Sequence, residues 1–159
     1  KYFDLGINNL IIGSMSVNKP EELKLLSDQY KDKIYISLDL MDNKVMIRGW
    51  KENSKLKIDD ILNIYKNTNI KGYIITDIEN DGMLKGLNIS FLNNIIEQME
   101  KNKNFKKSII IAGGLTNYED LTNLKKIHSS NIEGIISGKS FYVGNIDLRK
   151  AQMLLDSNG

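Results

Sequence analysis

Five short runs of consecutive apolar residues, many of them β-branched, recur along the chain. They are Leu10–Ile12, Ile34–Leu38, Tyr73–Ile75, Ile109–Ala112 and Ile135–Ile136. Apolar and polar residues do not alternate within these runs, which is typical of strands that are buried on both faces of a parallel sheet. We therefore expect five parallel strands that are covered by helices.

The segments between these runs have apolar residues at helical spacing, which predicts amphipathic helices. The expected buried stripes are Leu23, Leu26 and Tyr30; Ile58, Ile61, Leu62 and Tyr65; Leu92, Ile95, Ile96 and Met99; Tyr118, Leu121, Leu124 and Ile127; and Leu148, Ala151 and Leu155. Pro20 suits a first helical turn and Asn88 suits an N-cap. Thr116 and Glu119 have the spacing of a capping box.

The alternation of strands and helices predicts an α/β fold with right-handed crossovers between parallel strands. One segment, Lys44–Trp50, has a β-like pattern outside this alternation, and we interpret it as a long loop or hairpin above the sheet. No linker, low-complexity tract or domain boundary interrupts the pattern.

Composition narrows the classes of function. The chain is 41% hydrophobic and 26% charged, has no cysteine and carries a formal charge of +2, which excludes a disordered chain, a disulfide scaffold and a thiol-ligated metal site. The near-neutral charge argues against nucleic acid as a partner, and the apolar runs are too short to span a membrane. The absence of cysteine and of a signal peptide predicts a cytoplasmic protein. The single histidine, His128, lies at the end of a predicted helix, so neither histidine catalysis nor a metal site is expected.

Polar residues and glycines follow each expected strand. These strand ends are Gly13–Ser14, Asp39, Thr76–Asp77, Gly113–Gly114 and Gly138–Lys139. In a β/α barrel the carboxyl ends of all strands open on one face, which carries the chemistry. We therefore expect these residues to converge in space.

The glycine pairs indicate phosphate binding. Gly113–Gly114 and Gly138–Lys139 each precede a predicted helix, where backbone N–H groups and the helix dipole favour an anion. Gly13–Ser14 repeats the arrangement, so a second phosphate would bind on the opposite side. The alternative is that these glycines only close strand-to-helix turns, which is common.

Asp39 ends an apolar strand, where a carboxylate is costly unless it is solvated, paired or used. A general acid or base fits this position as well as a cap of the following loop does. Asp42 and Asp81 lie in turn-like sequences. Trp50 is interpreted either as a loop aromatic that covers a ligand or as a packing anchor.

Taken together, five stretches resemble the isomerase family of histidine biosynthesis. They are IIGSMSV at 11–17, SLDLMDNKVMIRGW at 37–50, ITDIENDGMLKGLN at 75–88, IAGGLTNYEDL at 111–121 and ISGKSFYVG at 136–144. The resemblance implies that residues 1–159 are a single C-terminal portion of a β/α barrel domain, a partial TIM (β/α)8 barrel that covers roughly the fourth to eighth βα units. It also implies an Amadori aldose–ketose rearrangement of ProFAR, a bis-phosphate ribonucleotide, to its ribulose form without a cofactor.

The resemblance also implies roles for individual residues. Asp39 matches the general acid, and Thr76 matches a residue that hydrogen-bonds the ribose. The phosphate-binding matches are Gly113, Gly114, Gly138 and Lys139 at one end and Gly13 and Ser14 at the other. Arg48 and Trp50 match the loop that closes over the substrate.

The expected general base belongs to the first three strands of the family barrel, which have no counterpart here. The chain is therefore expected to be an inactive fragment whose partner is the missing N-terminal barrel portion or a second copy. Two alternatives remain: the cyclase subunit of imidazole glycerol phosphate synthase, and a non-catalytic phosphate-binding half-barrel.

Overall fold

The fold is a parallel sheet with an antiparallel hairpin, in a computed structural model that describes residues 2–101 and 105–157. The strands are β1 (Leu10–Ile12), β2 (Ile34–Met41), β3 (Lys44–Ile47), β4 (Glu52–Lys57), β5 (Gly72–Asp77), β6 (Ser108–Ala112) and β7 (Ile132–Ile135). Strands β1, β2, β5, β6 and β7 pair in parallel in this order, while β3 and β4 extend antiparallel from the end of β2. The predicted α/β class with a parallel sheet is confirmed.

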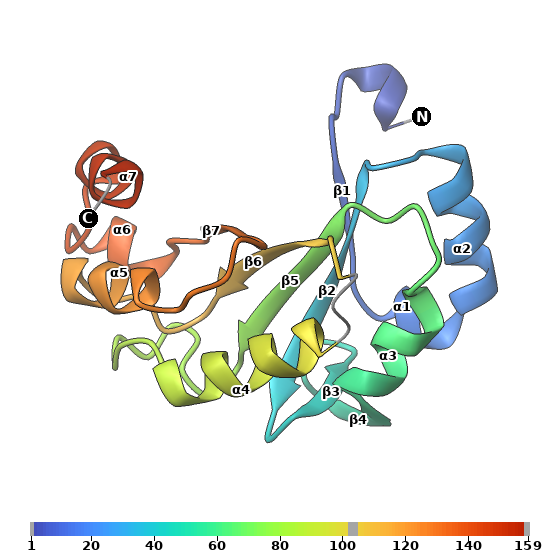
Figure 1. The fold of residues 1–159 in the computed structure, drawn as a ribbon, viewed down its shortest axis with the longest axis horizontal. Coiled ribbons are helices and arrows are strands. Elements are labelled where there is room, and N and C mark those ends of the chain that lie inside the picture. Colours follow the sequence, from blue (N-terminus) through green and yellow to red (C-terminus); the bar gives the residue numbers. More distant parts are fainter. Residues whose placement is uncertain (1, 102–104, 158–159) are drawn as a thin grey trace.

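Helices connect the parallel strands and flank the sheet from one end to the other (Figure 1). They are the 3-10 turn η1 (Phe3–Leu5), α1 (Met15–Asn18), α2 (Pro20–Gln29), α3 (Ile58–Tyr65), α4 (Ile89–Glu100), α5 (Tyr118–Lys125), α6 (Lys139–Tyr142) and α7 (Leu148–Asp156). None of the helices in the part of the chain that the structure describes has the length and apolarity needed to cross a membrane.

The two faces of the sheet have different neighbours. One face packs on the helices, and its core includes Ile36, Leu38, Ile75 and Ile111, all without exposed surface. The predicted stripe on α4 is confirmed, because its four apolar residues are all buried. On the opposite face, a smaller cluster joins residues of β2, β5 and β6.

A contact across the opposite face shows that the sheet is curved. The hydroxyl of Tyr35 on β2 donates to Oε2 of Glu133 on β7, although β5 and β6 lie between these strands. Three strand spacings of a flat sheet amount to about 14 Å, which is too far for these two side chains to bridge. The face that carries Tyr35 is therefore concave.

The expectation that all five strands are buried on both faces was wrong at the edges. Ile11 on β1 is 60% exposed, because β1 pairs only with β2 among the described strands. Ile136, directly after β7, is 45% exposed at the opposite edge. An apolar run of residues does not show whether its strand lies in the interior of a sheet or at an edge.

The sequence predicted two helix starts correctly and one incorrectly. Pro20 begins α2, and the side chain of Asn88 caps α4 by accepting a hydrogen bond from the Phe91 amide. The predicted capping box of Thr116 and Glu119 was wrong: Asn117 is the N-cap of α5. The box therefore lies one residue later in the sequence, and its acidic member is Asp120.

Candidate functional site

Asp39 and Thr76 lie side by side at the carboxyl ends of β2 and β5. They are directly paired in the sheet, and Thr76 is in turn paired with Ala112 on β6. Paired residues of neighbouring strands point to the same face, and successive residues alternate. Since Leu38 and Leu40 are buried in the helix-facing core, Asp39 and Thr76 lie on the concave face.

The carboxylate of Asp39 is held by two side chains. Its Oδ1 accepts from the Ser37 hydroxyl at 3.2 Å, and its Oδ2 accepts from the indole Nε1 of Trp50 at 2.8 Å. Trp50 belongs to the turn between β3 and β4, and this turn has three consecutive residues with positive φ angles, Arg48–Trp50. The turn of the hairpin thus reaches back to the end of β2. The expected hairpin is present, but its strand β3 is paired with β2 as part of the sheet and does not lie above it.

The same hairpin contacts the turn after β1. The backbone N–H of Arg48 donates to the hydroxyl of Ser14 at 2.9 Å. The guanidinium of Arg48 forms an exposed ion pair with Glu52 at 3.0 Å. The predicted residues Ser14, Arg48, Trp50 and Asp39 are therefore linked into one cluster at the carboxyl end of the sheet.

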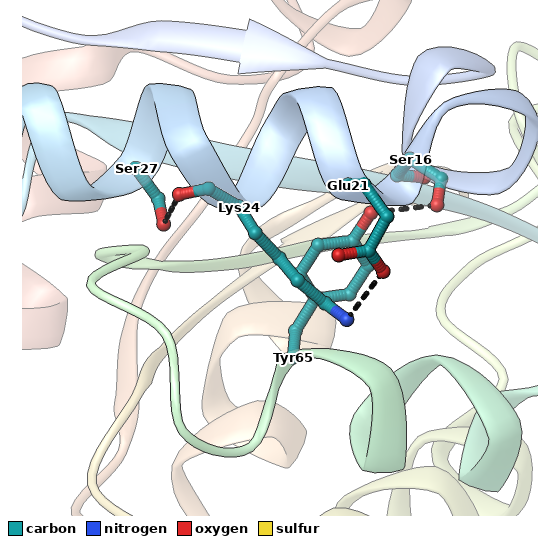
Figure 2. A network of polar contacts seen from close by, with 5 residues as sticks. All are labelled: Ser16, Glu21, Lys24, Ser27 and Tyr65. Carbon is teal, nitrogen blue, oxygen red and sulfur yellow. Dashed lines mark hydrogen bonds and ion pairs between the residues drawn. The ribbon is translucent and has the colours of Figure 1, made fainter.

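A buried contact fixes the helix that follows Gly13–Ser14. The hydroxyl of Tyr65 on α3 donates to the carbonyl oxygen of Ser16 on α1 at 2.7 Å (Figure 2). Burial, with a smaller contribution from the charge of Glu21, raises the pKa of Tyr65 to about 12. Glu21 itself is paired with Lys24 on α2. The helix after the Gly13–Ser14 turn is therefore anchored to α3.

A second group of predicted residues surrounds a cavity of about 280 Å³ at the ends of β6 and β7. Its lining consists of Asp81, Gly82, Leu84, Gly113, Gly114, Leu115, Ile136, Gly138 and Lys139. The four residues that were expected to form one phosphate site are thus brought together. The ammonium of Lys139 donates to the Gly82 carbonyl oxygen at 2.9 Å, so it ties the loop after β5 to the turn after β7.

The turn after β6 requires glycine for steric reasons. Gly113 and Gly114 have φ angles of 84° and 87°, which favour glycine. A Cβ atom on Gly113 would lie 2.5 Å from the carbonyl oxygen of Asp77. A side chain at this position would force the turn after β6 away from the end of β5.

The expected helix dipole is absent at Gly113–Gly114, because α5 begins only at Tyr118. Gly138 does directly precede α6, which is four residues long. The helix dipole therefore does not contribute at Gly113–Gly114, and the charged side chains among the lining residues of the cavity are Asp81 and Lys139.

Sequence reasoning missed part of this site. Asp81 and Gly82 were interpreted only as a turn, and they also line the cavity. Thr116 and Asp120 form hydrogen bonds that join the loop after β5 to the glycine turn. The sequence indicated a helix start near Thr116, but with Glu119 as the acidic partner, and Asp120 was not singled out. The loop partners Gly86 and Leu87 lie about 30 residues away along the chain.

His128 is exposed beyond α5. Within residues 2–101 and 105–157, no group of three or more histidine, cysteine, aspartate and glutamate side chains is arranged to hold a metal ion.

Comparison with known proteins identifies relatives along almost the whole chain. Three of them carry the name 1-(5-phosphoribosyl)-5-((5-phosphoribosylamino)methylideneamino) imidazole-4-carboxamide isomerase. The relative from Nautilia profundicola is 38% identical over 149 residues, which cover 94% of this chain and 59% of the relative. Those from Prochlorococcus marinus and Leuconostoc mesenteroides are 35% and 36% identical, and 57% and 59% of their lengths are covered.

The chain thus spans somewhat less than three fifths of the length of these curated relatives. A family model described as histidine biosynthesis protein matches residues 1–147. This match includes both clusters of site residues. The chain therefore belongs to the histidine biosynthesis protein family.

Proposed function

We propose that this chain supplies the general acid and the phosphate-binding turns of an aldose–ketose isomerase that acts on ProFAR. The observation that carries the proposal is the position of Asp39 and Thr76. They are paired on the concave face between the Ser14–Arg48–Trp50 cluster and the cavity lined by Gly113, Gly114, Gly138 and Lys139. A substrate with a phosphate at each end would place its ribose over the two central residues.

In the proposed reaction, the carboxyl group of Asp39 protonates the ring oxygen of the ribose. The ring then opens to a Schiff base, a general base removes the proton from C2, and the resulting enol relaxes to the aminoketose. The hydroxyl of Thr76 hydrogen-bonds the reacting ribose. Holding both phosphates fixes the ribose relative to the acid, and such positioning supplies much of the rate.

We also propose that residues 1–159 form a single portion of a β/α barrel domain, from the fourth to the eighth βα unit. Two observations support this assignment: the length matched in the relatives and the exposed apolar residues Ile11 and Ile136 at the edges of a curved sheet. The general base then comes from the remaining barrel portion. The polypeptide 1–159 by itself is expected to lack isomerase activity and to regain it when mixed with that portion.

Substitution of Asp39 by Asn in the full-length protein tests the catalytic assignment. The amide cannot donate the required proton, so turnover of ProFAR should be abolished. The affinity for substrate should change little, because the phosphate turns are intact. Ligand binding by calorimetry and product formation by absorbance measure the two separately.

Three results would contradict the proposal. Retained turnover in the Asp39→Asn variant would move the acid role to another group. Turnover of the ribulose form with ammonia, but not of ProFAR, would favour the cyclase. Tight binding of a bis-phosphate ligand without any turnover in the full-length protein would instead favour a non-catalytic module.

A further inference from the structure

Two polar residues hold the loop after β5 against the glycine turn after β6. Asp120 lies in the first turn of α5, and its side chain is buried, with only 9% of the residue exposed. Its Oδ1 accepts from the backbone N–H of Leu87 at 3.1 Å, across the gap between the two segments. Its Oδ2 accepts from the N–H groups of Thr116 at 2.8 Å and Asn117 at 3.2 Å.

The hydroxyl of Thr116 makes a second connection between the same segments. It accepts from the backbone N–H of Gly86 at 2.9 Å and donates to the carbonyl oxygen of Gly114 at 3.0 Å. One hydroxyl group therefore bridges the loop and the glycine turn. The backbones approach closely here, because a Cβ atom on Gly114 would lie 2.8 Å from the Gly86 oxygen.

Capping of α5 accounts for only part of these contacts. A capping box uses the side chains of Asn117 and Asp120 and the backbone N–H groups at the start of their own helix. The bonds to Gly86 and Leu87 lie outside this helix. Burial of the Asp120 carboxylate is costly unless its oxygens accept hydrogen bonds, and charge-assisted bonds of this kind are about twice as strong as neutral ones. The carboxylate therefore acts as a strong tether for the loop.

The tethered segments form two walls of the cavity at the ends of β6 and β7. Gly82 and Leu84 come from the loop, while Gly113 and Gly114 come from the turn. A ligand that needs several N–H groups at once loses affinity when these walls move independently, since binding then has to order them.

We propose that Thr116 and Asp120 are positioning residues for the phosphate cavity: they lock the loop 78–88 onto Gly113–Gly114 before the ligand arrives. This inference rests on the proposed function, because it takes the ligand of the cavity to be a phosphate group of the substrate. Neither residue lines the cavity. Their effect is exerted through the backbone that they hold.

Thr116→Val and Thr116→Ser in the full-length protein test the inference. Valine keeps the shape and removes both hydrogen bonds, whereas serine retains the hydroxyl. With ProFAR as the substrate, Thr116→Val should raise KM about three- to tenfold, as expected for one to two lost hydrogen bonds, and should change kcat less. Thr116→Ser should remain within about twofold of wild type.

Asn117→Ala is the matched control for a purely structural effect. The Asn117 side chain accepts from the backbone N–H groups of Glu119 and Asp120 in α5, so its loss weakens the helix start without releasing the loop. We expect a lower Tm with an unchanged KM. A KM that follows Tm equally in Asn117→Ala and Thr116→Val would overturn the inference.

A measurement on the wild-type protein keeps the inference testable if Thr116→Val does not fold. Inorganic phosphate should slow amide hydrogen exchange at Gly86 and Leu87, and unchanged exchange with bound phosphate would overturn the inference. If the wild type turns over ProFAR normally and Thr116→Val has an unaltered KM, the inference is overturned while the proposed function stands. Absence of both phosphate binding and turnover in the wild type would overturn the proposed function as well.

Discussion

The Tyr65 hydroxyl illustrates how one buried polar group connects helices that are distant in the sequence. It donates to the Ser16 carbonyl oxygen, and so ties α3 to the helix after the Gly13–Ser14 turn (Figure 2). Replacing Tyr65 by Phe leaves this oxygen without its partner. The free energy of unfolding should fall by about 0.5–1.5 kcal/mol, measured by urea denaturation near neutral pH.

The raised pKa of Tyr65 also predicts a pH dependence. An unfolded tyrosine ionises near pH 10.0, while folded Tyr65 keeps its proton until about pH 12. Its contribution to stability is therefore fully present below pH 10 and is lost as the pH rises through 12. Between these values, wild type should lose stability more steeply than Tyr65→Phe. Equal slopes in urea titrations at pH 9 to 11.5 would contradict this assignment.

The prediction of individual site residues depended on where their partners lie. Asp39 was recognised because a carboxylate at the end of an apolar strand is unusual. Its contact with Trp50, eleven residues later, required the tight turn that brings the hairpin back. Thr116 and Asp120 were not assigned to the site, because their distant partners are backbone groups, and backbone groups leave no signal in side-chain type.

Helix α2 shows that the pattern of apolar residues identifies the buried face of an element. Leu23 has no exposed surface, whereas Leu25 on the same helix is 71% exposed. Leu23→Ala should lower the free energy of unfolding by about 2–5 kcal/mol, because it removes buried methyl groups and leaves a cavity. Leu25→Ala is the control and should stay within about 0.5 kcal/mol of wild type. Similar losses of stability from both substitutions in urea denaturation would show that Leu23 does not lie on the buried face of α2.

Element boundaries were less predictable than element types. The strand expected at Tyr73–Ile75 extends over Gly72–Asp77, and it includes Thr76 because pairing with β2 and β6 continues there. The helix expected near Thr116 begins at Tyr118, since Thr116 is used in contacts with Gly86 and Gly114 instead. Hydrogen bonds to other segments of the chain thus determine where β5 ends and where α5 begins.

The parallel part of the curved sheet ends at β1 and β7, and each of these strands is paired on one side only among the described strands. Exposed strand edges with apolar neighbours favour association. The polypeptide 1–159 is therefore expected to self-associate with increasing concentration, measured by sedimentation velocity. Ile11→Lys places a charge on the concave side of β1 and should weaken this association.

Leu25→Lys replaces a similarly exposed leucine on α2, outside both edge strands, and should leave the association unchanged. A monomer at all concentrations, or equal effects of the two lysine substitutions, would show that the edges are not the contact surface. Addition of the remaining barrel portion should displace the self-associated form if both compete for the same edges.

Local patterns in the amino-acid sequence were sufficient to predict the α/β class, the parallel strands and the position of Asp39, because hydrophobic periodicity and strand ends are short-range properties. Folding in three dimensions established the hydrogen bond between Trp50 and Asp39, the curvature that joins Tyr35 to Glu133, and the tether from Asp120 to Leu87. These contacts connect residues 11, 98 and 33 positions apart. Such pairings depend on how the strands and loops pack, which no local run of residues encodes.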